Sequence, residues 1–261
     1  MLTVDDLHIS LAGASVLHGV TLQAEPGQVT AIVGPNGSGK TTLLRAITQD
    51  LPYSGKISLD GSDIANLSGR QLAARRAVLP QASRIAFPFT VLEIVRLGMM
   101  SSARPAPDAR AAAALARVGL AGFEDRFYQE LSGGEQQRAQ LARVLTQVWD
   151  PVGADGPNWL LLDEPVSSLD IGHQLEVMDL IADYARNGGG VIAVMHDLNL
   201  TAMFAHRIVL LAGGQCLASG PPDAVLTDAI LSRAYRCTLR VNTAPPEPAT
   251  YLLPHMARRA G

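Results

Sequence analysis

The chain has 261 residues, enough to bury a sizeable core in one large domain or two lobes. Hydrophobic residues make up 48% and charged residues 17%, which excludes a disordered or polyelectrolyte chain. The formal net charge of -3 argues against a protein that mainly binds nucleic acid. Two cysteines, Cys216 and Cys237, exclude a disulfide scaffold and a CxxC zinc module, so we expect a reducing compartment.

The amino-terminal segment is not typical of a secretory signal, because it carries two early aspartates and lacks an apolar stretch. No apolar run approaches the roughly 18 residues that span a bilayer. We therefore expect a soluble protein, or one that is attached to a membrane only through a partner.

The first third of the sequence predicts a β layer. Alternating apolar residues at 7–11 favour a half-buried strand, and the apolar run at 29–33 favours a second strand. Alternation at 57–59, followed by Asp60-Gly61, predicts a hairpin.

The middle of the chain differs in composition. Within residues 84–148, segments such as 108–118 are rich in alanine, leucine and arginine, which favour helix, and a loop is expected at 101–107. This composition predicts a helical lobe inserted into a β/α core.

The core then resumes. Short apolar runs at 159–162 and 191–195 suit strands that are buried on both faces of a parallel sheet. Residues 175–186 have helical spacing, 208–219 predict a hairpin, and the proline-rich stretch 241–261 predicts an irregular tail.

A complete GxxxxGK[ST] motif follows the strand expected at 29–33. Its glycines let several backbone N–H groups face one anion, and the helix beginning near Thr42 adds its positive end. Lys40 can reach the terminal phosphates, and the Thr41 hydroxyl can hold Mg²⁺. The motif alone does not distinguish a kinase, a GTPase or a motor. It predicts nucleotide binding by Gly34, Pro35, Asn36, Gly37, Ser38, Gly39, Lys40, Thr41 and Thr42.

Two acids, Asp163 and Glu164, end the apolar run that begins at Trp159. Open α/β sheets bind ligands at the carboxyl ends of their strands. Acids at strand ends are more often solvated or helix-capping, but the complete phosphate loop favours a catalytic interpretation. We expect Asp163 to hold Mg²⁺ and Glu164 to lie near a water that attacks the γ-phosphate.

The segment LSGGEQQR at 131–138 predicts the start of a helix. Ser132 and Glu135 have the spacing of a capping box, and Gly133 and Gly134 leave backbone N–H groups uncovered at the positive end of the helix. An ordinary capped helix is the alternative. An exposed helix start of this kind suits a second anion.

Together these segments resemble the ATP-binding cassette ATPases over nearly all of residues 1–240. The phosphate loop, LSGGEQQR, LLLDEP at 160–165 and SSLD at 167–170 stand in the family's order. Gln81, in VLPQ, matches the family's glutamine loop, and His196, in VMHD, matches its switch histidine.

The resemblance implies an α/β fold with a P-loop NTPase (RecA-like) core, an N-terminal antiparallel β layer and an inserted α-helical subdomain. It places the core at 1–83 and 149–240, the helical subdomain at 84–148 and a C-terminal tail at 241–261.

The resemblance also implies ATP and Mg²⁺ as cofactors and a head-to-tail homodimer that holds two ATP molecules. Ser132, Gly133 and Gly134 of one copy would bind the γ-phosphate held by the other copy, and Asp170 would link the two sites. The pairing agrees with an exposed helix start that has no phosphate of its own.

Within each site, the resemblance assigns Gln81 to sensing Mg²⁺ and the attacking water. Glu164 would be the catalytic base, and His196 would contact the γ-phosphate. Leu11 departs from the family, which often stacks adenine on an aromatic residue there, so base selectivity is left open. Val166 replaces the usual threonine after DEP, and we expect little effect.

A single cassette without a membrane span resembles bacterial importers with separate permease subunits, which places it at the cytoplasmic face of the inner membrane as a peripheral protein. Residues 85–93 resemble the segment of iron-siderophore, heme and vitamin B12 importers that meets the permease. Phe87 and Phe89 would contact the permease, or both would pack inside the helical lobe.

The extension at 147–158 and the segment 170–174 resemble the hemin import branch of the family. This branch implies two permease subunits and a periplasmic heme-binding protein as partners. A siderophore or vitamin B12 importer is the alternative.

Two other classes compete with this interpretation. A cassette protein acting on DNA or ribosomes generally carries two cassettes, a coiled coil or basic arms, and the acidic balance argues against a nucleic acid partner. A small-molecule phosphotransferase would have no use for LSGGEQQR.

Overall fold

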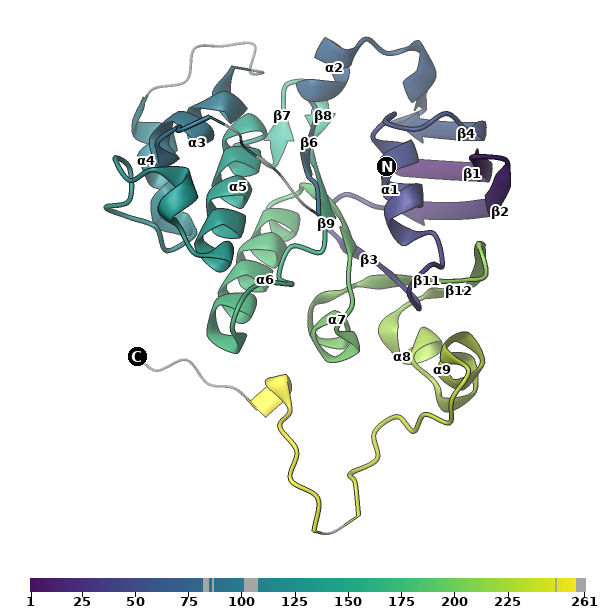
Figure 1. The fold of residues 1–261 in the computed structure, drawn as a ribbon. Coiled ribbons are helices and arrows are strands. Elements are labelled where there is room, and N and C mark those ends of the chain that lie inside the picture. The colour runs from purple at the N-terminus through teal and green to yellow at the C-terminus, as the bar shows by residue number, and fades with distance from the viewer. Residues whose placement is uncertain (82–84, 86, 101–107, 247, 257–261) are drawn as a thin grey trace.

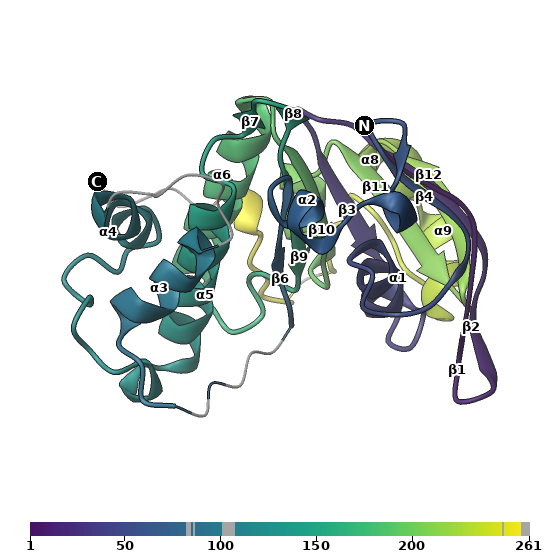
Figure 2. The same ribbon diagram turned by 90° about the horizontal axis from the view of Figure 1, so that it is seen from above.

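The computed structural model describes residues 1–81, 85, 87–100, 108–246 and 248–256. Figures 1 and 2 show a central sheet with a helical lobe on one side and a second, antiparallel sheet on the other. The predicted fold class is confirmed. In the part of the chain that the structure describes, none of the helices has the length and apolar character needed to cross a membrane.

The antiparallel sheet confirms the predicted β layer. Its strand order is β2-β1-β4-β5. Leu7 and Ile9 alternate with exposed residues and are buried against the core. Asp60 and Gly61 both have positive φ, as a two-residue hairpin turn requires. The strands are β1 (Leu2–Leu11), β2 (Ala14–Ala24), β4 (Ser54–Leu59) and β5 (Ser62–Asp63).

The central sheet has the order β12-β11-β3-β10-β9-β6 and is parallel except for β12. Every residue of β3, β9 and β10 is buried, which explains their unbroken apolar runs. The carboxyl ends of β3, β10, β9 and β6 therefore meet at one edge. The strands are β3 (Val29–Val33), β6 (Arg76–Leu79), β9 (Trp159–Asp163), β10 (Gly190–Val194), β11 (Arg207–Ala212) and β12 (Gln215–Gly220).

Helix α1 (Lys40–Ile47) follows the phosphate loop and packs between the two sheets. Leu43 lies in one apolar cluster with residues of the antiparallel sheet and with Ile32 of the central sheet. Buried Arg76 of β6 donates to the carbonyl of Thr48 at 2.8 Å and to that of Ile47, which ties the end of α1 to β6.

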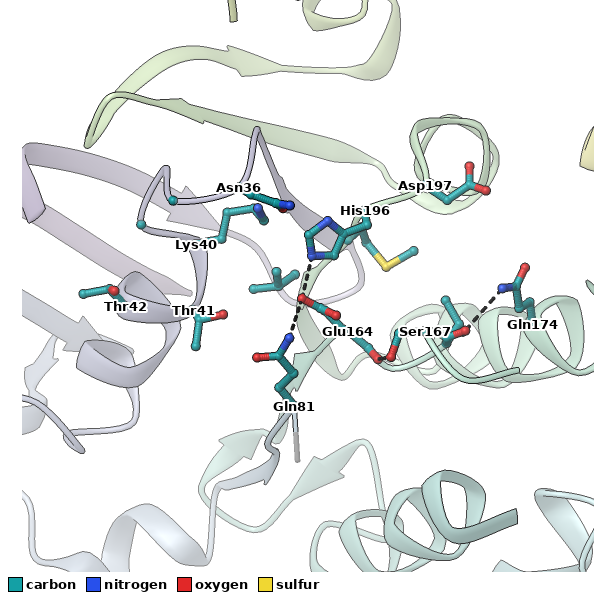
Figure 3. Close-up of a pocket in the computed structure, with 15 residues that line it drawn as sticks. Asn36, Lys40, Thr41, Thr42, Gln81, Glu164, Ser167, Gln174, His196 and Asp197 are labelled. Atoms are coloured by element: carbon teal, nitrogen blue, oxygen red, sulfur yellow. Dashed lines mark hydrogen bonds and ion pairs between the residues drawn. The ribbon is translucent and has the colours of Figure 1, made fainter. Parts of the chain in front are cut away.

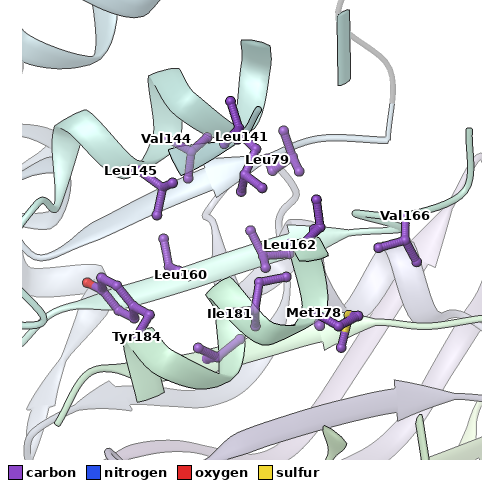
Figure 4. Packing of buried hydrophobic residues seen from close by; sticks show 14 of the residues in the cluster. Leu79, Leu141, Val144, Leu145, Leu160, Leu162, Val166, Met178, Ile181 and Tyr184 are labelled. Carbon is purple, nitrogen blue, oxygen red and sulfur yellow. The ribbon is translucent and has the colours of Figure 1, made fainter. Parts of the chain in front are cut away.

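The other face of the central sheet packs against helices from both lobes. Figure 4 shows Leu160 and Leu162 of β9 beside Leu141 and Val144 of α5 (Gly133–Gln147) and Ile181 of α6 (Ile171–Arg186). This shared cluster joins the helical lobe to the core.

The helical lobe consists of α3 (Val91–Met99), α4 (Asp108–Arg117) and α5. The loop predicted at 101–107 lies outside the described residues. Phe87 and Phe89 do not behave alike: Phe87 is 70% exposed, whereas Phe89 is half-buried against the core cluster. The two rings meet edge to face at a centroid distance of 6.4 Å.

The extension before β9 folds into a small hairpin that composition did not predict. It pairs β7 (Val152–Gly153) with β8 (Gly156–Pro157). The Arg117 guanidinium stacks on the Trp149 ring, with its Cζ 4.1 Å from the ring centroid.

Short helices complete the fold. The described part of the stretch after residue 240 is irregular apart from one 3-10 turn. The short helices and turns are α2 (Gly69–Ala73), α7 (Leu198–Phe204), α8 (Pro222–Val225), α9 (Asp228–Tyr235) and the 3-10 turns Ile64–Asn66, Tyr128–Glu130 and Pro254–Met256.

Candidate functional site

The phosphate loop leaves the end of β3 in a conformation that depends on glycine. Gly34, Gly37 and Gly39 all have positive φ. A Cβ at Gly34 would lie 2.1 Å from the carbonyl oxygen of Leu211, and one at Gly39 would lie 2.4 Å from Cδ2 of Leu17. Neither position accepts a side chain, so the loop can turn its backbone N–H groups outward at the start of α1.

The Lys40 side chain lies inside this loop and contacts its backbone. Its Nζ donates to the carbonyl oxygens of Gly34 at 2.9 Å and Pro35 at 3.1 Å, and the residue is only 6% exposed. Burial lowers the pKa of the Lys40 ammonium, and the nearby carboxylates of Glu164 and Asp163 oppose that shift. The cation is thus held inside the loop where a phosphate would bind.

Thr41 and Asp163 form a pair of oxygen ligands at the same edge. Thr41 Oγ1 donates to Asp163 Oδ1 at 3.2 Å, although β9 and α1 are far apart in sequence. Burial raises the pKa of the Asp163 carboxyl, and the hydrogen bond from Thr41 partly offsets this.

Glu164 is held from two sides by residues that follow neighbouring strands. Its Oε1 accepts from Gln81 Nε2 at 2.9 Å and contacts His196 Nε2 at 2.5 Å (Figure 3). Gln81 follows β6 and His196 follows β10, and these strands flank β9. Parallel pairing therefore brings the three side chains together from residues far apart in sequence.

These groups, apart from Asp163, line one cavity of about 750 Å³, which we call the nucleotide cavity. It collects most of the residues predicted from the phosphate loop together with Gln81, Glu164 and His196. Sequence reasoning missed several lining residues; among them Asp197 caps α7 by accepting from Asn199 N at 2.7 Å, a pattern that its place before an apolar run could have indicated. The lining is Asn36, Gly37, Gly39, Lys40, Thr41, Thr42, Gln81, Glu164, Val166, Ser167, Gln174, Val194, Met195, His196 and Asp197.

The described lining of the nucleotide cavity does not include the remaining phosphate-loop residues Gly34, Pro35 and Ser38. Pro35 and Ser38 line a second cavity of about 660 Å³, next to the β11–β12 turn and α9. Asp163 lines a smaller hollow of about 220 Å³ together with Thr41 and Gln81.

The segment 131–138 begins α5 as predicted. Ser132 Oγ accepts from Glu135 N at 3.3 Å, and Glu135 Oε2 accepts from Ser132 N at 2.8 Å. The capping box is therefore present. Ser132 and Gly133 are exposed, and the described lining of the nucleotide cavity includes none of Ser132, Gly133 and Gly134.

Two further predicted residues also lie outside the described lining. Asp170 caps α6 by accepting from His173 N at 3.0 Å and is exposed. This contact lowers the pKa of the Asp170 carboxyl, with a second contribution from the His173 side chain. Leu11 ends β1, half-buried against the apolar cluster of the antiparallel sheet.

Comparison with known proteins identifies the family. A family model described as "ABC transporter" matches residues 17–167. The chain belongs to the ABC transporter family. The hemin import ATP-binding protein HmuV of Jannaschia sp. (strain CCS1) is 68% identical over 261 residues, covering 100% of this chain and 97% of the relative. HmuV of Roseobacter denitrificans is 61% identical over 254 residues, covering 97% of each chain.

A solved structure of the same ABC transporter family extends the likeness to the fold. The protein cbiO1 from Clostridium perfringens, part of the ABC transporter complex cbiONQ, is 26% identical with a TM-score of 0.71, covering 89% of this chain and 92% of that one. The predicted ABC-type ATPase, its binding of ATP and the resemblance to the hemin import branch are confirmed.

Proposed function

We propose that this chain is the ATP-hydrolysing subunit of a bacterial importer that drives uptake of hemin. The relatives at 68% and 61% identity, which carry the hemin import name, support the cargo. The observation that carries the activity is the convergence of Lys40, Thr41, Glu164 and His196 on one cavity. Such a cavity places the phosphates of a nucleotide beside a group that can accept a proton from water.

In the proposed reaction, Glu164 accepts a proton from a water molecule whose oxygen bonds to the γ-phosphorus. The bond between that phosphorus and the β,γ-bridging oxygen breaks, and ADP and phosphate leave. Gln81 and His196 fix the direction of the Glu164 carboxylate, and Lys40 offsets the phosphate charge. The same proposal assigns His196 to the γ-phosphate and Gln81 to the attacking water.

Magnesium fits the oxygen pair of Thr41 and Asp163, because Mg²⁺ prefers hard oxygen ligands and binds through few protein groups together with phosphates. Burial raises the pKa of the Asp163 carboxyl, so its negative charge is poorly compensated within the chain, and a cation would supply that compensation. We assign Thr41, Asp163 and Gln81 to holding Mg²⁺, which when bound neutralises charge on the phosphate oxygens.

The proposed active unit is a head-to-tail pair of two copies. Ser132, Gly133 and Gly134 lie at the positive end of a 15-residue helix, outside the described lining of their own cavity. They would bind the γ-phosphate held by the second copy, and the exposed Asp170 would lie between the two sites. The unit would comprise a core at 1–83 and 149–240, a helical subdomain at 84–148 and a tail at 241–261.

The pair would couple to two transmembrane permease subunits at the cytoplasmic face of the inner membrane, fed by a periplasmic heme-binding protein. The 70% exposure of Phe87 supports this ring as the permease contact, whereas the partial burial of Phe89 against the core cluster favours a supporting role.

Glu164→Gln tests the catalytic assignment. Glutamine keeps an oxygen for Gln81 and His196 but cannot take the proton, so we expect ATP hydrolysis to fall at least 100-fold with ATP binding retained and a closed pair trapped. The matched control is Glu130→Gln, which changes an exposed acid outside the cavity lining. Hydrolysis at the wild-type rate in Glu164→Gln would show that the base is misassigned.

Reconstitution with the permease and a periplasmic binding protein tests the cargo. We expect ATP hydrolysis to be stimulated by the heme-loaded binding protein and not by a siderophore-loaded one. Stimulation by a siderophore-loaded or vitamin B12-loaded protein alone would transfer the same role to those importers.

A further inference from the structure

Gln137, on the second turn of α5, uses both ends of its amide to contact the loop after β9. Its Nε2 donates to the carbonyl oxygen of Glu164 at 2.7 Å, and its Oε1 accepts from the backbone N–H of Ser168 at 3.1 Å. Ser167 donates to the same Glu164 carbonyl through Oγ at 3.2 Å and through its backbone N–H at 3.3 Å. One side chain of the helical lobe thus spans residues 164–168.

The backbone at Glu164 needs such support. Its φ is +54°, a left-handed conformation that a residue with a Cβ keeps only when its surroundings hold it there. The Glu164 N–H donates to the carbonyl of Val194 on β10 at 3.1 Å, while the Glu164 carbonyl is held by Gln137. The direction in which the carboxylate leaves the backbone therefore depends on both β10 and α5.

The start of α5 also packs closely against the same loop. A Cβ at Gly134 would lie 3.1 Å from the carbonyl oxygen of Ser168 and 3.2 Å from Leu169 Cδ2. Because the helix start has little space to slide against the loop, a displacement of α5 would displace the backbone that carries Glu164.

We infer that Gln137 is a positioning residue that couples the two nucleotide sites of the pair. The inference rests on the proposed function, in which the start of α5 serves the partner's nucleotide while Glu164 serves the nucleotide of its own chain. When the partner's γ-phosphate binds at Gly133 and Gly134, Gln137 transmits the position of α5 to the Glu164 carbonyl. The orientation of each base is then coupled to the filling of the neighbouring site.

Two substitutions separate this role from general packing. Gln137→Met keeps the length of the side chain and removes both hydrogen bonds. Gln137→Glu keeps an acceptor for Ser168 but places a negative oxygen against the Glu164 carbonyl. Gln147→Met is the matched control, because Gln147 on the same helix donates in the same way to the carbonyls of Ala73 at 2.9 Å and Arg76 at 3.0 Å, outside the nucleotide cavity.

The measurement is steady-state ATP hydrolysis against ATP concentration, with ATP binding followed by a fluorescent analogue and folding by thermal melting. For Gln137→Met and Gln137→Glu we expect kcat to fall about tenfold, the Hill coefficient to drop toward 1, and KM and ATP affinity to stay within about twofold. Gln147→Met should match wild type in kcat, Hill coefficient, KM and ATP affinity. Should Gln137→Met fail to fold, Gln137→Glu carries the same test.

Wild-type kcat and Hill coefficient in both Gln137 variants would overturn the coupling, and so would a loss of kcat with an unchanged Hill coefficient. Failure of the proposed function would look different: the wild-type chain would not hydrolyse ATP, or Glu164→Gln would hydrolyse it at the wild-type rate.

Discussion

Gly133 gives a direct test of a nucleotide site shared between two copies, because the fold leaves room for a side chain there. Among the described residues, apart from the two chain neighbours of Gly133 and the adjoining backbone of its own helix, no heavy atom lies within 4 Å of the position that a Cβ would take there. In Gly133→Asp, the new carboxylate lies in the first turn of α5, where a negative charge stabilises a helix by about 0.3–1 kcal/mol. We therefore expect the isolated variant to melt no lower than wild type.

The same carboxylate would face the γ-phosphate of the partner. Two unit charges about 4 Å apart at an effective dielectric constant of about 20 repel by about 4 kcal/mol. Since each 1.4 kcal/mol is about tenfold in an equilibrium constant, each of the two such contacts in the pair should weaken pairing by roughly 1,000-fold. Gly133→Ala adds the Cβ without the charge and should pair within about tenfold of wild type.

Sedimentation velocity with ATP, in chains that also carry Glu164→Gln to prevent hydrolysis, measures the pairing. The melting temperature of each variant separates repulsion from a folding defect. Equal pairing of Gly133→Asp and Gly133→Ala, with both chains folded, would refute the assignment of this helix start to the partner's phosphate.

Three further predictions address single features of the chain. The hydrogen bond from Ser132 holds the pKa of Glu135 below its ordinary value. The charged carboxylate therefore stabilises the fold above the ordinary pKa, and this stability is lost as the pH falls through the lowered pKa. Between about pH 5 and pH 3, the melting temperature of Glu135→Gln should fall less than that of wild type. Arg76→Met leaves two buried carbonyls at the end of α1 unpaired and should lower the free energy of unfolding by about 2–4 kcal/mol, read as a lower urea midpoint with an unchanged m-value. Leu11→Tyr offers a ring for adenine and should tighten ATP binding about tenfold or more in a competition assay, since stacking contributes about 1–3 kcal/mol per base; an unchanged affinity would place the base elsewhere.

Features of this molecule that depend on a few consecutive residues were predictable from the sequence. The spacing of Ser132 and Glu135 predicted the capping box, and the apolar run ending at Asp163 predicted a strand buried on both faces. The phosphate loop was predictable because its glycines and Lys40 shape it through local backbone conformation and contacts within a few consecutive residues.

Features that depend on packing between distant segments were not predictable. Strand β6 has only four residues, and its pairing with β9 follows from the whole sheet rather than from its own pattern. The two hydrogen bonds of Gln137 join residues 27 and 31 positions apart, which no periodicity indicates. The different exposures of Phe87 and Phe89 likewise depend on how the helical lobe folds back on itself, where the backbone N–H of Tyr128 donates to the Phe89 carbonyl.

The order of strands in the central sheet bears on when the nucleotide site can form during synthesis of the chain. Strand β10 lies between β3 and β9 and is the last of the three to be made. A nascent chain that has emerged only through residue 189 already contains the phosphate loop and both acids at the carboxyl end of β9, but it lacks the strand between β3 and β9. We therefore expect competence to bind nucleotide to be acquired late in translation, once β10 has been made.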